Sequence, residues 1–271
     1  MKAITEQAEQ YLEDGVILLK DCMNLNLMKK TSEKYELLEP QNINRGIPRD
    51  KPRLAFWRHV SGPSDTFRNF EEFPELWDLI TENIVPVIRS HFRNDDGSEL
   101  RVQFIETIVF NKPPGGPFLA WHQDGSYYPL KPNVQIGTWI PLQPVTKESG
   151  AMLYVPGSQK FGARATADIY MGNPMPYETN IRIPADPAAE GHEVICYEMN
   201  PSDMVLHDGY TWHASGPNTT QGQRKGISVR FVIDEARYFP RPGNKNEEMC
   251  FDAQVDIKPG DILQGKPFPL L

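Results

Sequence analysis

The chain has 271 residues, of which 39% are hydrophobic and 24% charged, and its 28 basic against 36 acidic residues give a net charge of -8. This composition is that of a globular protein with a sizeable core. The acidic balance argues against a nucleic-acid or anionic-membrane partner, which would need a basic face. No apolar run approaches the roughly 18–20 residues that span a bilayer, so we expect no membrane segment.

The N-terminus and the cysteines indicate a cytoplasmic protein. The opening residues, MKAITEQAEQYLEDG, carry early acids and no apolar stretch, so we expect no signal peptide. The three cysteines, Cys22, Cys196 and Cys250, lie far apart without CxxC spacing. This pattern favours free thiols in a reducing compartment over a disulfide framework.

The first hundred residues are mainly helical in pattern. Helical periodicity occurs in three segments, residues 3–12, 24–38 and 74–92. Pro86 should kink or divide the last of these helices. The apolar run GVILLKD (15–21) predicts a buried strand, and the Pro-, Arg- and Asn-rich residues 39–66 predict a loop with one short element at most.

After Gly97 the pattern changes to short runs that are rich in β-branched and aromatic residues and bounded by turn residues. Six such runs occur, at 100–111, 135–145, 150–158, 192–200, 203–208 and 226–234. They predict an all-β sandwich or barrel with helices packed outside. The long irregular segment 162–190 is typical of a lid or binding loop.

We therefore expect a single domain over residues 1–271. Residues 1–98 would supply helical support and lid segments, residues 99–239 the β core, and the proline-rich residues 240–271 an extended tail that wraps the domain.

The stretch AWHQDGSYYP (120–129) places a histidine and an acid two residues apart. If residues 120–126 form a strand, His122 and Asp124 project from the same face. An imidazole nitrogen and a carboxylate oxygen can then bind one metal ion. The pair alone is a weak signal, because the chain has six histidines and most single histidines lie on surfaces or bond within cores.

A third ligand could come from the second half of the chain. His213 would complete a set of two histidines and one carboxylate, which leaves three positions open and suits non-haem Fe(II). His207, followed by Asp208, is the rival for this position. His213 is preferred because of the residues that follow it.

Arg224 lies eleven residues after His213, and the intervening Ser-Gly-Pro-Asn favours a turn. The chain can therefore leave the metal and return along the next strand. A guanidinium there could form a two-pronged contact with a carboxylate whose other end chelates the metal. These residues predict a site that holds a dicarboxylate end-on.

Together, HQD at 122–124, NKPPGG at 111–116, TWIPL at 138–142, ESGAMLYVPGSQK at 148–160 and HASGPNTTQGQRKGIS at 213–228 resemble the phytanoyl-CoA dioxygenase family of Fe(II)/2-oxoglutarate oxygenases. The resemblance runs from about residue 9 to residue 239. It implies a double-stranded β-helix (jelly-roll) core and the use of Fe(II), 2-oxoglutarate and O₂.

The resemblance also implies roles for individual residues. His122, Asp124 and His213 match the iron ligands. Arg224 matches the arginine that grips the far carboxylate of 2-oxoglutarate. Three further positions match residues beside the co-substrate, namely Ser215, Trp139 and Ile108.

The carboxylate bears on the type of reaction. In the halogenase branch of such enzymes a small residue replaces the acid, whereas Asp124 is present here. The resemblance therefore implies hydroxylation of an unactivated C–H, with release of succinate and CO₂. Desaturation, ring closure and epoxidation are alternatives that the sequence does not separate.

Arg230 is the main candidate for binding the substrate. It lies six residues after Arg224 on the predicted strand, so both should face the same way. Arg230 could hold a carboxylate, phosphate or phosphonate of the substrate. Alternatively, it could pair with an acid such as Glu106 or Asp234.

Four aromatic or basic residues are further substrate candidates. Tyr127 and Tyr128 follow the HQD strand at the expected mouth of the barrel, although surface packing explains them equally well. Trp57 and Arg58 lie in the segment that could fold over the opening, although Trp57 could instead pack on the core.

The substrate is expected to be a small polar molecule, because an acidic chain without a basic stripe offers little to hold the phosphates of an acyl-CoA. Some enzymes that look like this one hydroxylate small aminophosphonates such as 2-aminoethylphosphonate, which we take as a candidate. Two rival classes remain: a cupin-like zinc or nickel protein, which does not need Arg224, and a degenerate binding module, which does not need the full ligand set.

Overall fold

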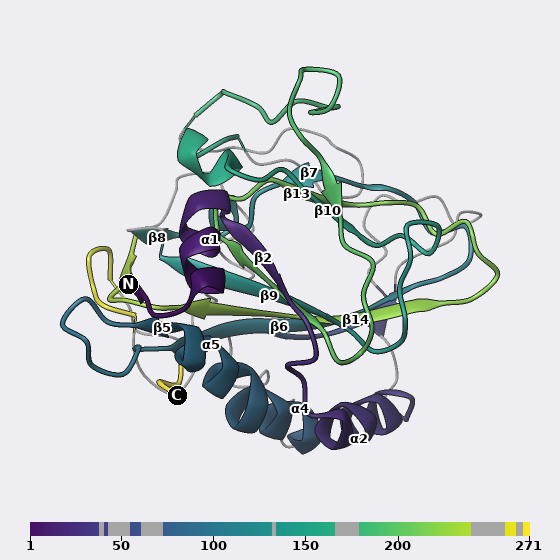
Figure 1. Cartoon of the computed structure of the whole chain (residues 1–271), viewed down its shortest axis with the longest axis horizontal. Helices are drawn as coiled ribbons and strands as arrows, with labels where there is room; N and C mark the ends of the chain where they lie inside the picture. The colour runs from purple at the N-terminus through teal and green to yellow at the C-terminus, as the bar shows by residue number, and fades with distance from the viewer. Residues whose placement is uncertain are drawn as a thin grey trace.

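Two antiparallel β-sheets form the centre of the structure (Figure 1). This computed structural model describes residues 1–37, 41–42, 55–60, 73–131, 134–165, 179–239, 258–263 and 268–271, with the backbone alone for 41–42 and 55–60. The larger sheet has the strand order β2-β12-β9-β14-β6-β4-β3 and the smaller has the order β11-β10-β13-β7. The predicted jelly-roll fold is confirmed.

The strands of the larger sheet, in spatial order, are β2 (Val16–Leu19), β12 (Met204–Asp208), β9 (Gln135–Pro141), β14 (Arg224–Val232), β6 (Gln103–Lys112), β4 (Ala55–Val60) and β3 (Gln41–Asn42). Those of the smaller sheet are β11 (Ile195–Cys196), β10 (Met152–Tyr154), β13 (His213–Ser215) and β7 (Leu119–His122). Two short ladders join β1 (Lys2–Ala3) to β5 (Phe92–Arg93) and β8 (Leu130–Lys131) to β15 (Arg237–Tyr238).

The helices come mostly from the first hundred residues and pack along the larger sheet (Figure 1). They are α1 (Glu6–Asp14), α2 (Leu25–Tyr35), α4 (Pro74–Leu79) and α5 (Val85–His91), with a π-helical turn at Ile80–Ile84 and 3₁₀ turns at Asp124–Ser126 and Ser158–Phe161. Pro86 lies just after the π-helical turn. Because proline has no N–H for the helical ladder, an irregularity is expected at this point.

The N-terminal third also supplies strands, which the sequence only partly indicates. The predicted strand at 15–21 is β2 at one edge of the larger sheet. Near the other edge, β4 is the one short element that was expected within the segment 39–66, and it pairs with β6. The predicted lid segment falls largely outside the described residues (166–178), as does most of the predicted tail (240–257 and 264–267).

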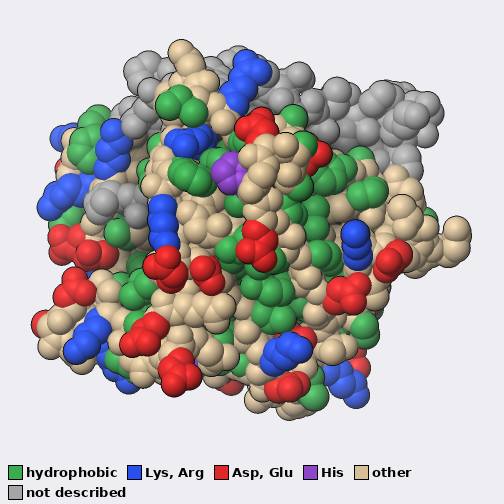
Figure 2. All heavy atoms as spheres, turned by 45° about the horizontal axis from the view of Figure 1, so that its top comes forward, with side chains coloured by type: hydrophobic (Ala, Val, Ile, Leu, Met, Phe, Trp, Pro, Cys, Tyr) green, Lys and Arg blue, Asp and Glu red, His purple; other side chains and the backbone are tan. Residues whose placement is uncertain are grey.

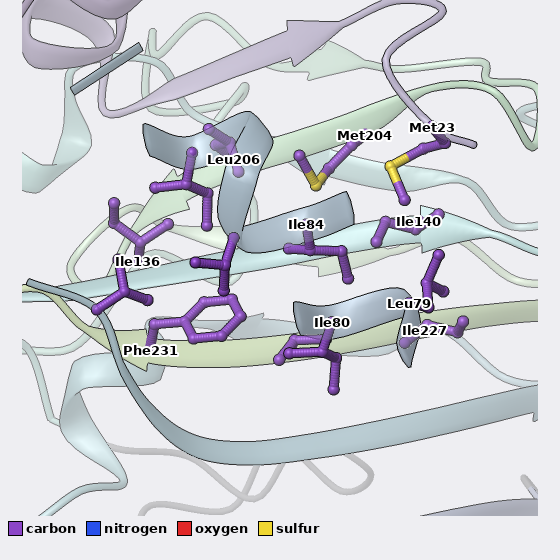
Figure 3. Close-up of a cluster of buried hydrophobic side chains, with 14 of the residues drawn as sticks. Met23, Leu79, Ile80, Ile84, Ile136, Ile140, Met204, Leu206, Ile227 and Phe231 are labelled. Carbon is purple, nitrogen blue, oxygen red and sulfur yellow. The ribbon is translucent and has the colours of Figure 1, made fainter. Parts of the chain in front are cut away.

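The main core lies between the helices and the larger sheet. Leu79, Ile80 and Ile84 of the helical segment are fully buried and lie against strand side chains that include Ile227 and Phe231 (Figure 3). Burial of each such side chain contributes about 1.5–3 kcal/mol. Residues 227, 229 and 231 of β14 belong to this core, so the alternate residues of the strand face the other way, into the jelly roll.

Candidate metal centre

His122, Asp124 and His213 lie together inside the jelly roll. Each offers a ligand atom, and these three atoms lie within 4.8 Å of one another. Because β13 pairs with β7, His213 lies directly opposite His122 in the smaller sheet. All three side chains are buried, with 8%, 2% and 2% of their surface exposed.

Asp124 reaches this cluster in a different way from the one expected. Strand β7 ends at His122, Gln123 is still extended (φ -131°, ψ 136°), and Asp124 begins a 3₁₀ turn. The prediction of a strand over 120–126 is therefore wrong at its C-terminal end. A single extended residue between His122 and Asp124 is enough to bring their side chains together.

Both histidines present the same nitrogen to the centre of the cluster. Nδ1 of His122 lies 2.7 Å from the carbonyl of Ala120, and Nδ1 of His213 lies 2.9 Å from the carbonyl of Thr211. A proton on Nδ1 satisfies each carbonyl and leaves Nε2 as a lone-pair donor. Burial lowers the pKa of both imidazoles, that of His213 strongly, which favours the neutral form that binds metals.

The carboxylate of Asp124 is held by two other side chains. Arg230 places Nη2 2.9 Å from Oδ1 and Nε 2.8 Å from Oδ2, and Nε2 of His207 lies 3.0 Å from Oδ2. Burial favours the protonated acid, but the nearby guanidinium, with His213 and His207, holds the pKa of Asp124 well below its usual value. Asp124 therefore remains an anion inside the protein.

His207 is a neighbour of the cluster rather than a fourth member of it. Among the described residues, the group able to hold a metal contains His122, Asp124 and His213, and the contact with Asp124 occupies Nε2 of His207. The fit is close, because a Cβ on Gly137 would lie 2.2 Å from that nitrogen. Only glycine at position 137 leaves room for this imidazole.

Arg224, the first residue of β14, forms a second buried polar cluster with Ser215. It is 2% exposed, and Nη2 donates a 2.7 Å hydrogen bond to Oγ of Ser215. Its guanidinium carbon lies 5.3 Å from the ring centre of Trp139, which packs over Gly226, where a Cβ would be 2.4 Å from the indole. Burial lowers the pKa of Arg224 to about 10, so it remains a cation at neutral pH. Ile108, also matched to this region, is half-buried on β6.

Among the described residues, the buried polar atoms without a hydrogen-bond partner include Nε of Arg224, Nη1 of Arg230, Nδ1 of His207 and Oη of Tyr154. The ring of Tyr154 lies 5.9 Å from that of His213, and the side chain interacts electrostatically with Asp124 and Arg224. Buried polar groups are normally paired. Unpaired atoms between the histidine cluster and Arg224 fit a site that a metal ion and a polar, anionic molecule complete.

The remaining substrate candidates lie in different places. The ring of Tyr127 is 5.8 Å from that of His122, which places it beside the cluster. Tyr128 instead donates to the buried Glu106. Trp57 and Arg58 lie in β4, whose side chains are outside the described residues.

Arg230 does face the same way as Arg224, as strand alternation predicts, but its partner is Asp124. Glu106 lies opposite Arg230 in the β6–β14 register, while Asp234 is exposed. The structure thus gives Arg230 an acidic partner that the sequence did not single out.

Acidic and basic side chains are interspersed on the face drawn in Figure 2. Within the described ranges, no helix has the length and apolar character needed to cross a membrane.

The family profile of phytanoyl-CoA dioxygenase (PhyH) matches residues 11–226. The chain belongs to the phytanoyl-CoA dioxygenase family. It is 24% identical over 258 residues to the peroxisomal phytanoyl-CoA dioxygenase of Homo sapiens, covering 90% of this chain and 72% of that protein. It is also 24% identical over 236 residues to a probable alpha-ketoglutarate-dependent hypophosphite dioxygenase of Stutzerimonas stutzeri, covering 85% of this chain and 79% of that protein.

Solved structures share the fold. The carbocyclase SnoK from nogalamycin biosynthesis superposes with a TM-score of 0.69 at 20% identity, covering 98% of this chain and 96% of that one. The epimerase SnoN in complex with Fe³⁺, alpha-ketoglutarate and nogalamycin RO gives a TM-score of 0.68 at 20% identity, covering 97% and 96%. Family membership makes this chain a 2-oxoglutarate-dependent dioxygenase that uses Fe(II), 2-oxoglutarate and O₂.

The two candidate distal histidines can be separated by metal binding. His213→Ala should weaken Mn(II) or anaerobic Fe(II) binding about 100-fold or more, because it removes a donor from a three-ligand set. His207→Ala should cost about 10- to 100-fold, as is typical of residues that orient a ligand. Both affinities can be measured by titration calorimetry on folded protein. Tighter binding by His213→Ala than by His207→Ala would contradict this assignment.

Proposed function

We propose that the protein binds Fe(II) through Nε2 of His122, a carboxylate oxygen of Asp124 and Nε2 of His213, and hydroxylates an unactivated C–H of a small polar molecule. The observation that carries this proposal is the placement of the three-ligand cluster beside Arg224 and Ser215 in one buried site. The products besides the alcohol would be succinate and CO₂. When bound, iron and 2-oxoglutarate supply the oxidising chemistry with O₂.

The chain's own residues position and insulate this chemistry. The carbonyls of Ala120 and Thr211 fix both imidazoles with Nε2 inward. Arg230 and His207 keep Asp124 ionised and oriented. Burial of the ligands excludes water, which strengthens each electrostatic contact.

Arg224 and Ser215 would hold the far carboxylate of 2-oxoglutarate. The guanidinium is buried, charged and hydrogen-bonded through Nη2 to the serine hydroxyl, and its Nε has no hydrogen-bond partner among the described residues. A bound carboxylate would satisfy that donor. Trp139 under the guanidinium and Ile108 on β6 would line this end of the site.

The co-substrate assignment has a direct spectroscopic test. Anaerobic addition of Fe(II) and 2-oxoglutarate should give the weak visible metal-to-ligand charge-transfer band in the wild type. With Arg224→Ala, about 10- to 100-fold more 2-oxoglutarate should be needed to reach the same intensity, because a charged hydrogen bond is lost. Absence of the band in folded wild type, or the same titration curve for both proteins, would refute the assignment.

We further propose a small aminophosphonate, such as 2-aminoethylphosphonate, as the substrate candidate. Two observations support it: a relative is described as a probable hypophosphite dioxygenase, and Nη1 of Arg230 is buried with no hydrogen-bond partner in the described ranges. Tyr127, beside His122, would contact the substrate, and Trp57 and Arg58 of β4 remain candidates for contacting it. Ring closure or desaturation is the alternative outcome, since a protein of similar fold is described as a carbocyclase. A cytoplasmic location remains a prediction from the sequence.

The substrate proposal is tested by succinate release. Small aminophosphonates, amino acids and aromatic acids are compared under identical conditions, with uncoupled turnover as the baseline. Aminophosphonates should raise succinate formation at least about tenfold over uncoupled turnover, and Tyr127→Ala should raise KM or lower kcat while 2-oxoglutarate binding is kept, because Tyr127 lies beside the cluster. If phosphonates give only baseline turnover, this candidate is rejected.

A further inference from the structure

Lys112 is a buried lysine that contacts no carboxylate within the described part of the chain. It has 0% exposed surface, and Nζ lies 2.7 Å from Oγ of Ser215 and 3.5 Å from the carbonyl oxygen of that residue, with a further contact to the carbonyl of Gly216. None of its contacts among the described residues is with an acid. Buried lysines are uncommon unless they are paired.

Two glycines leave space for the side chain of Lys112. Lys112 ends β6 within the NKPPGG motif, and a Cβ on Gly116 would lie 2.5 Å from its Cγ. Gly150, in the 147–150 turn at φ +86°, lies beside the same side chain, and a Cβ there would be 3.3 Å from Cδ of Lys112. Two glycines from separate loops thus leave room for the lysine stem and deliver Nζ to Ser215.

Lys112 and Arg224 are neighbouring buried basic side chains. They are directly opposite each other in the β6–β14 register, and both donate to the same oxygen, Oγ of Ser215. That hydroxyl in turn donates to the carbonyl of Gly150. Burying both groups as cations on one neutral acceptor is unfavourable, because neither has an acidic partner among the described residues.

The charge state of Lys112 in the free protein reflects this arrangement. Burial, together with the guanidinium of Arg224, lowers the pKa of Lys112 to about 6. Arg224 on β14 is the charged group that faces it. The β13 side and the adjoining loops present Ser215, Asn218 and backbone carbonyls, whereas Lys147 and Glu148 of the 147–150 turn are exposed. The amine of Lys112 is therefore largely neutral at pH 7.5 in the free protein.

We propose that Lys112 is a positioning residue for the co-substrate, which fixes Ser215 and supplies a second positive charge when the far carboxylate of 2-oxoglutarate binds. This inference rests on the proposed co-substrate site at Arg224. It has two consequences. The protein should take up a proton as 2-oxoglutarate binds at neutral pH, and it should discriminate strongly against 2-oxo acids that lack the far carboxylate.

Proton uptake is measured by titrating 2-oxoglutarate into Mn(II)-loaded protein in buffers of different ionisation enthalpy. At pH 7.5 the wild type should take up close to one proton, and near pH 6 about half as much, because a pKa of about 6 leaves the lysine half charged there. Prior loading with Mn(II) keeps metal-linked protons out of the measurement.

The variant Lys112→Met keeps a stem of similar length but removes the charge. It should abolish the uptake, weaken 2-oxoglutarate binding about 10- to 100-fold, and leave binding of 2-oxopentanoate within about twofold of the wild type. Lys225→Met is the matched control, because Lys225 is the next residue to Arg224 on β14 and contacts Glu36 instead. It should bind both ligands as the wild type does.

Unchanged proton uptake and affinity in folded Lys112→Met would overturn the proposal and leave Lys112 a structural residue. If that variant does not fold, the wild type alone still tests the proposal. No proton uptake at pH 7.5, or an uptake at pH 6 equal to that at pH 7.5, would contradict it. Failure of the wild type to bind 2-oxoglutarate at all would instead refute the proposed function.

Discussion

Asp124 is a carboxylate that keeps its charge inside the protein because Arg230 and His207 both contact it. An isolated buried carboxylate would take up a proton and lose its value as a metal ligand. Its two partners come from β14 and β12, which both pair with β9 in the larger sheet, whereas the two histidines of the cluster come from the smaller one. The cluster thus depends on the correct packing of one sheet against the other.

The same packing creates two kinds of polar environment in the interior of the jelly roll. Around Asp124, the guanidinium of Arg230 balances the negative charge. The neighbouring imidazoles are neutral and can donate a lone pair to a metal cation. Around Ser215, the guanidinium of Arg224 supplies positive charge and the amine of Lys112 is a second basic group, with no acidic partner among the described residues. A metal cation at the first point and a carboxylate at the second complete both environments, which is why a chelating dicarboxylate fits this jelly roll.

Much of this arrangement is predictable from local sequence. Period-two alternation places Arg224 and Arg230 on one face of β14, and the structure agrees, with Phe231 in the opposite core. The HQD spacing brings His122 and Asp124 together even though the strand ends between them, since one extended residue suffices.

Other features depend on pairings between distant segments, which a single sequence does not reveal. Tyr154 reaches the site because it lies opposite His213 in the β10–β13 register, and Lys112 because it lies opposite Arg224. His207 has the residue type of a metal ligand, but its Nε2 contacts the carboxylate of Asp124, in space that Gly137 leaves open. Residue type and spacing indicate candidates, whereas sheet register decides which of them contact the metal.

The central claim is that this cluster, in this geometry, holds the metal and chelates the co-substrate. A crystal structure of the protein prepared anaerobically with Fe(II) and 2-oxoglutarate, with iron located by its anomalous signal, tests it most directly. We expect iron bonded to Nε2 of His122, to a carboxylate oxygen of Asp124 and to Nε2 of His213, with the far carboxylate of 2-oxoglutarate on Arg224. Iron bonded to His207 in place of His213, or 2-oxoglutarate bound away from Arg224, would contradict it.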